Sequence, residues 1–146
     1  MSVIKDLQIV GGDLFASGRG FATVTGAAYV RQRVATALAE PYGSDPYHPQ
    51  WGSALPGYLG IPQDPGTPAM VSSEVSRVLA QLIAAQQLMI TSAAMTGTRS
   101  QLAASDVIAS VNSVEAVQGT PGSVSVVVSL TTQGGQLMTL SRTVTG

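Results

Sequence analysis

Two stretches of the chain place apolar residues at the spacing of an amphipathic helix. The first, residues 26–40, is ended by Pro41 and carries its apolar stripe at Val30, Val34, Ala37 and Leu38. The second begins at Thr67-Pro68, which is typical of an N-cap followed by proline in the first turn. Its stripe consists of Val71, Val75, Val78, Leu79, Leu82 and Ile83. The pattern therefore predicts two helices. Over residues 84–95 the stripe weakens, and a strand over 88–90 is also allowed.

Alternating apolar and polar residues flank these helices at both ends of the chain. Residues 7–25 read as short strands broken by glycines, which predicts a hairpin. Residues 107–117, 124–130 and 137–144 read as three strands joined by two tight turns, with one face packed on the helices and one polar face. We detect no internal repeat and no linker. The sequence thus predicts a single α+β domain over residues 1–146, with an N-terminal β-hairpin, two helices and a C-terminal three-stranded antiparallel sheet (β-β-α-α-β-β-β).

The composition narrows the possible functions. Charged residues make up 10% of the chain, against a usual share of about 25%, and the net charge is −1. A surface so poor in charge suits a protein that works among close neighbours, although drift toward small neutral residues is an equal explanation. The arginines form no basic stripe, which argues against nucleic-acid partners. The absence of cysteine excludes thiol catalysis and cysteine-based metal sites.

We also expect neither a signal peptide nor a membrane helix. The N-terminus has no continuous apolar core of the kind that a signal peptide needs, so we expect synthesis in the cytoplasm. Residues 78–98 carry no charge and match a membrane span in length. They include Gln81, Gln86, Gln87 and Thr91, and we therefore expect no membrane helix.

The segment from Glu40 to Gly60 holds the only Trp, three of the four Tyr, the only His and four of the eight Pro. A loop this long and aromatic is typical of a rigid functional element rather than a simple connector. Tyr47 and Tyr58 either form a contact surface or pack locally, because Trp and Tyr are enriched at binding hot spots. We expect Trp51 to fill the gap between the helices and the sheet. His48 has no second His or Cys for a metal site and no evident acid partner, so we interpret it as a loop residue.

The loop residues resemble a known family. The chain is similar to the baseplate wedge and sheath-initiator proteins of contractile phage tails and related injection systems, long labelled tail-lysozyme-like. The resemblance rests on the helix VRQRVATALAE, followed by Glu40-Pro41-Tyr42-Gly43, then Pro46-Tyr47, Pro49 and the segment Trp51-Gly52-Ser53-Ala54-Leu55 with Leu59-Gly60 beyond. It covers about half of the chain closely, and the remaining elements agree only in order and length.

The resemblance implies a virion component of the tail baseplate, assembled in the host cytoplasm. It would be a structural protein without cofactor, metal or catalytic activity, present in several copies in a ring around the tail tube. Its partners would be the tail sheath protein, the baseplate wedge proteins and the tail tube. A Glu-Pro-Arg triplet that many members carry after the second helix is absent here, so only Gln86, Gln87 and Met89 are positional candidates for the wedge contact.

A sheath initiator is implied to offer a preformed sheet edge onto which sheath arms add as strands. Main-chain hydrogen bonds supply the affinity in such β-augmentation, and alternate side chains fix the register. Charged residues and proline usually block the edge of a sheet. The last two predicted strands contain no Pro and a single charge, Arg142. The residues predicted to bind the partner there are Val124, Val126, Val128, Leu137 and Leu140. The alternative is that these strands pair only with each other.

Two other classes stay open on the sequence. A peptidoglycan-degrading, lysozyme-like enzyme would need two carboxylates flanking a cleft, and Glu40 with Asp45 is the available pair. A helix end and a turn before proline explain these two acids without chemistry. A small soluble binding domain would need a pocket with convergent polar groups.

Overall fold

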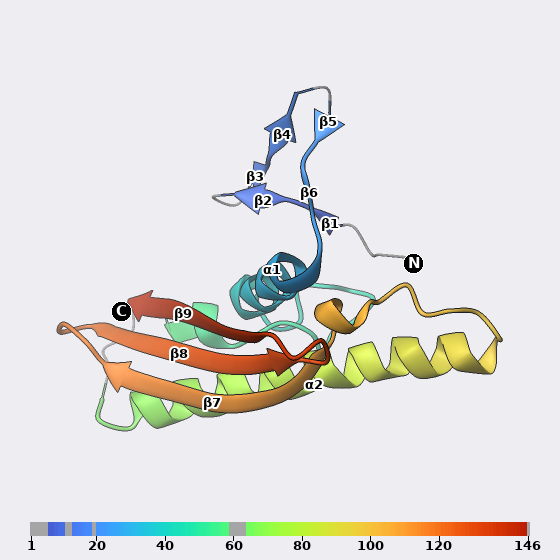
Figure 1. Ribbon diagram of the computed structural model, residues 1–146. Helices are drawn as coiled ribbons and strands as arrows, with labels where there is room; N and C mark the ends of the chain where they lie inside the picture. The colour runs from blue at the N-terminus through green and yellow to red at the C-terminus, as the bar shows by residue number, and fades with distance from the viewer. Residues whose placement is uncertain (1–5, 11–12, 19, 59–63, 146) are drawn as a thin grey trace.

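The computed structural model describes residues 6–10, 13–18, 20–58 and 64–145. It confirms an α+β domain (Figure 1) in which two helices cover one face of a C-terminal antiparallel sheet. The helices are α1 (Gly26–Ala39) and α2 (Thr67–Met95), with short 3-10 turns η1 (Leu55–Tyr58) and η2 (Ala104–Asp106). The sheet consists of β7 (Ile108–Gln118), β8 (Ser123–Thr132) and β9 (Leu137–Thr145), in that order.

The central strand β8 shows why one face of the sheet is buried. Its alternate residues Val124, Val126, Val128 and Leu130 are at most 2% exposed. These side chains meet the helices because successive residues of a strand point to opposite faces. The other face of β8 carries Ser125, Ser129 and Thr131 and is half-buried or exposed, as the alternation predicts.

Both helices contribute their predicted stripes to a single core. Val30, Val34 and Leu38 of α1 are buried, as are Val71, Val75, Val78 and Leu79 of α2. Two details of α2 differ from the prediction. Gly66 is the N-cap, and Thr67 is the first helical residue, its hydroxyl bonded to Asp64. The helix also continues to Met95, so the strand alternative over residues 88–90 is wrong.

The C-terminal half of α2 extends past the sheet (Figure 1), which explains its weak stripe. Leu88, Met89 and Met95 are exposed there, whereas the first half packs on β7 and β8. By length and composition alone, α2 is apolar enough to cross a membrane, with a mean hydropathy of 1.4 over its most apolar window, of which 17% is buried. The absence of a membrane contact stays a prediction.

The N-terminal segment is more elaborate than the predicted hairpin. Six two-residue strands pair as β1 (Asp6–Leu7) with β6 (Thr23–Val24), β2 (Ile9–Val10) with β3 (Asp13–Leu14), and β4 (Ala16–Ser17) with β5 (Gly20–Phe21). Each extended segment therefore changes partner at its midpoint. We call residues 6–24, as far as described, the N-terminal unit. It stands away from the sheet on the far side of α1 (Figure 1).

A closed ring of three backbone hydrogen bonds joins the segments of this unit. Gln8 N donates to Ala22 O, Ala22 N donates to Phe15 O, and Phe15 N donates to Gln8 O, at 2.8–2.9 Å. The three residues are seven apart, and the six strands follow the same seven-residue spacing. The expectation of no internal repeat is therefore wrong at this short length scale.

Candidate interaction surface

Strand β9 forms a regular edge of the sheet. Its register with β8 runs without a break from Ser123↔Thr145 to Thr131↔Leu137. Among the described residues, its neighbour in the sheet is β8 alone, and no backbone hydrogen bond joins residues 138–145 to another segment. Arg142 is its single charge, and it contains no Pro. Although η1 lies near β9, the main-chain donors and acceptors on the outer side of β9 have no backbone partner among the described residues, and such groups can pair with another strand.

The opposite edge, β7, is less regular. Its pairing with β8 shifts register between Ile108 and Ser110 and again between Val111 and Ser113. Such bulges twist an edge and interrupt the hydrogen-bond spacing that an incoming strand would follow. Of the two edges, β9 is therefore the better template for strand addition.

The structure gives the predicted partner-binding strand residues different positions. Val124, Val126 and Val128 lie in β8, which is paired on both sides, and their side chains belong to the core. The prediction that these three residues form an open edge is therefore wrong. Their side chains stabilise the sheet and are not accessible to a partner. On β9, Leu137 is 70% exposed, and Leu140 is half-buried on the face that packs toward the helices.

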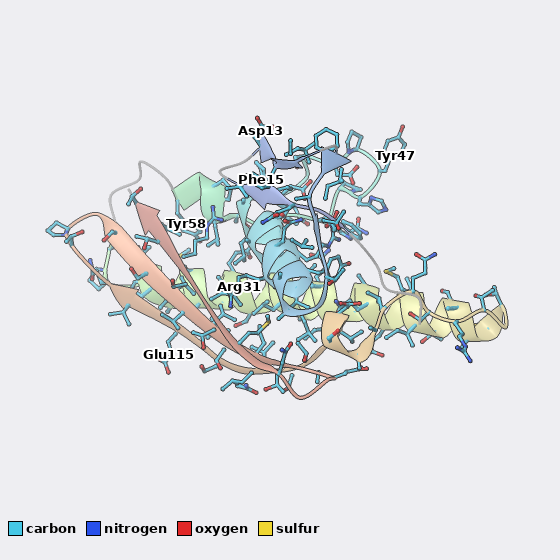
Figure 2. The ribbon with its side chains drawn as sticks, turned by 45° about the horizontal axis from the view of Figure 1, so that its top comes forward. Asp13, Phe15, Arg31, Tyr47, Tyr58 and Glu115 are labelled. Carbon is cyan, nitrogen blue, oxygen red and sulfur yellow. The ribbon has the colours of Figure 1, made fainter. Side chains whose placement is uncertain are left out.

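The aromatic side chains of the loop differ in exposure: Tyr42 and Tyr47 are exposed, whereas Trp51 and Tyr58 are half-buried. Tyr47 is 89% exposed and points away from the body (Figure 2), so it is available for contact. Tyr58 is half-buried against the core beside the start of α2. Trp51 is half-buried and lines a cavity of about 80 Å³ with Ala37 of α1 and Val78 of α2. The residues that line this cavity come from α1, the loop and α2, so Trp51 lies beside a gap between the two helices.

His48 has an acid partner three residues before it, Asp45, so the expectation that it lacks one is wrong. Its Nδ1 lies 2.8 Å from Asp45 Oδ2, and its ring stacks on Trp51 with centroids 4.3 Å apart. The hydrogen bond from His48 lowers the pKa of Asp45. The described residues contain no group of three His, Cys, Asp or Glu side chains suited to a metal ion. The arrangement closes a turn and gives the loop a fixed shape.

An ion pair on α2 anchors the same loop. Arg77 donates to Glu74 at 2.8 Å and to Gly52 O at 2.8 Å, and Glu74 accepts the Ala54 amide at 2.7 Å. The hydrogen bonds from Arg77 lower the pKa of Glu74. The Arg77 guanidinium also lies 5.2 Å from the ring centre of Tyr42. This network was not predicted from the sequence, because its members come from the loop and from α2.

The candidate catalytic acids take structural contacts. Glu40 accepts a hydrogen bond from Ser44 Oγ at 3.3 Å and lines the cavity beside Trp51. Asp45 does not line that cavity, and its lowered pKa is opposite to the raised pKa that a general acid needs. The geometry therefore supplies no argument for a paired-carboxylate cleft at these two residues.

The candidates for the wedge contact differ from one another. Gln86 clamps the chain before β7: its Nε2 donates to Asp106 O at 2.9 Å and its Oε1 accepts the Ile108 amide at 3.0 Å. Gln87 and Met89 are exposed on the projecting part of α2. Gln86 thus has an internal role, whereas Gln87 is free to meet a partner.

With this geometry in view, comparisons with family models, curated proteins and solved structures find no match.

Proposed function

We propose that this chain is a structural component of a contractile-tail baseplate, which joins the wedge around the tail tube and templates the first sheath ring. The observation that carries the proposal is the β9 edge: nine residues in unbroken register, without proline and with one charge. An extended sheath arm would add beside β9 as a fourth strand by β-augmentation.

The rest of the surface supports an assembly role. The chain is poor in charge, like the cores of protein interfaces. Tyr47 on a rigid loop and Gln87 on the projecting half of α2 offer separate contacts for wedge or tube proteins. Several copies around the tube would then hold several β9 edges in a ring.

Hydrogen–deuterium exchange tests the proposal directly. The purified chain is compared alone and with the tail sheath protein from the same source. Strand addition should slow exchange at amides of residues 137–145, because free-edge amides become hydrogen-bonded. The bulged edge, residues 108–118, serves as the internal control and should not change. Unaltered exchange over β9, or protection confined to β7, would contradict the proposal.

A further inference from the structure

A groove of about 840 Å³ runs along the exposed side of α1, between the N-terminal unit and β9. The N-terminal unit contributes Gln8, Ile9 and Val24, and β9 contributes Arg142. Figure 2 shows α1, with Arg31 labelled, lying between the N-terminal unit and the sheet. The groove therefore borders the open edge of the sheet.

Small side chains line much of the α1 wall. The alanines there are Ala27, Ala28, Ala35 and Ala39. A strand added beside β9 would point every second side chain to the face on which Leu140 and Arg142 lie, because side chains alternate along a strand. Those side chains would enter the groove, where the alanines leave room for larger apolar groups.

Two guanidinium groups border the same space. Arg31 of α1 and Arg142 of β9 both line the groove, and neither forms a hydrogen bond or ion pair among the described residues. No Asp or Glu lines the groove with them. Arginine binds carboxylates with paired, charge-assisted hydrogen bonds. A segment carrying one acid among apolar residues would complement both the charge and the shape.

We propose that the groove selects an extended strand whose inward-facing side chains are apolar apart from one Asp or Glu, which binds Arg31 and Arg142. This inference rests on the proposed function and deepens it, since it specifies the segment that β9 accepts. The backbone of the strand would pair with β9. The carboxylate would set which residue stands opposite Arg142, and so the register.

Labelled peptides test the selection. The probe is Thr-Val-Thr-Val-Thr-Glu-Thr-Val-Thr, and its partner has Gln in place of Glu. Fluorescence anisotropy with the full chain should show the Glu peptide binding at least about tenfold more tightly, as expected for charge-assisted hydrogen bonds. The double variant Arg31→Gln/Arg142→Gln should bind both peptides equally, whereas Arg99→Gln, which changes an exposed arginine outside the groove, should keep the preference.

Thermal unfolding of each variant verifies that it folds. Equal binding of the two peptides, no binding of either, or a preference that survives the double variant would each overturn the inference. Its failure is distinguishable from failure of the proposed function. If the sheath protein protects β9 but the peptides show no charge preference, the selection alone is wrong. If the Glu preference holds but the sheath protein leaves β9 exchange unchanged, the initiator role is wrong.

Discussion

At the scale of single residues, the aromatic loop depends on a close backbone contact at Gly52 that leaves no room for a side chain. Gly52 has a φ of +94°, and a Cβ built on it would lie 2.5 Å from Pro41 O and 2.9 Å from Glu40 O. Ser53 N donates to Glu40 O, and Tyr42 N donates to Ser53 O, so the loop closes back onto the end of α1. Glycine at this position allows that closure.

We predict that Gly52→Ala lowers the free energy of unfolding by about 2 kcal/mol or more, because the new methyl group meets backbone atoms that cannot move aside. Gly57→Ala is the matched control, since a Cβ there meets nothing within 4 Å. Urea unfolding followed by Trp51 fluorescence measures both. Equal stability of the two variants would contradict the account of the loop.

The Glu74–Arg77 pair predicts a pH dependence. Because Glu74 has a lowered pKa in the folded state, its contribution is present above the unfolded pKa of about 4.3 and is lost as pH falls through the folded value. Glu74→Gln should therefore lower stability at pH 7 by about 1 kcal/mol and flatten the loss of stability below pH ~4. Denaturant titrations at pH 7 and at acid pH check this. An unchanged pH profile would show that the pair contributes nothing.

The adjacent glutamines of α2 are expected to differ in their contribution to stability, because Gln86 is hydrogen-bonded inside the fold and Gln87 is exposed. Gln86→Ala removes two hydrogen bonds that hold the chain before β7 and should cost about 1–2 kcal/mol of stability. Gln87→Ala should change stability by less than about 0.5 kcal/mol, because its side chain is exposed. Thermal denaturation of the two variants measures both effects. A Gln87→Ala variant as destabilised as Gln86→Ala would contradict this assignment of roles.

At the scale of elements, the sequence predicts the helices and strands whose apolar residues recur at a regular local spacing. The buried stripes at Val30–Leu38 and Val71–Leu79 and the three C-terminal strands are confirmed. The strand pairing of the N-terminal unit was not predicted, because its strands change partner every few residues. A hairpin is the simplest interpretation of short alternating segments. The C-terminal half of α2 has a weak stripe because it extends past the sheet, which leaves Leu88, Met89 and Met95 exposed.

The candidate site was predictable only in part. Two tight turns already imply that the second C-terminal strand lies in the middle and is paired on both sides, so Val126 and Val128 could have been excluded from an open edge. Replacing either with Lys would bury an unpaired charge, and a resulting loss of sheath assembly would report unfolding rather than a blocked edge. Arg31 and Arg142 lie far apart in sequence, and only the fold brings them to one groove.

The attachment of the N-terminal unit gives a prediction about elements. Gln32 of α1 accepts a hydrogen bond from Ile9 N at 2.9 Å and donates one to Leu7 O at 2.8 Å. Gln32→Ala should speed amide exchange in residues 6–24 about tenfold and leave the melting temperature nearly unchanged, because the unit opens without the core. Thr36→Ala, which changes an exposed side chain one turn further along α1, is the control. Exchange unaffected by Gln32→Ala would show that other contacts hold the unit.

At the scale of the whole molecule, the pattern is a rigid core with several uncovered surfaces. One antiparallel edge is regular and borders a groove, one loop presents Tyr47, and half of a long helix projects past the sheet. Only 10% of the residues are charged, and a low share of charge is typical of surfaces that neighbours cover in an assembly.

We propose that β9 receives a strand of the sheath protein at the base of a contractile tail. Electron cryomicroscopy of the assembled particle from the source of this chain tests it most directly. We expect density for this fold between the tube and the first sheath ring, with a sheath segment as a fourth strand beside residues 137–145. Density for the fold with an unoccupied β9 edge, or no density for it in the baseplate, would contradict the claim.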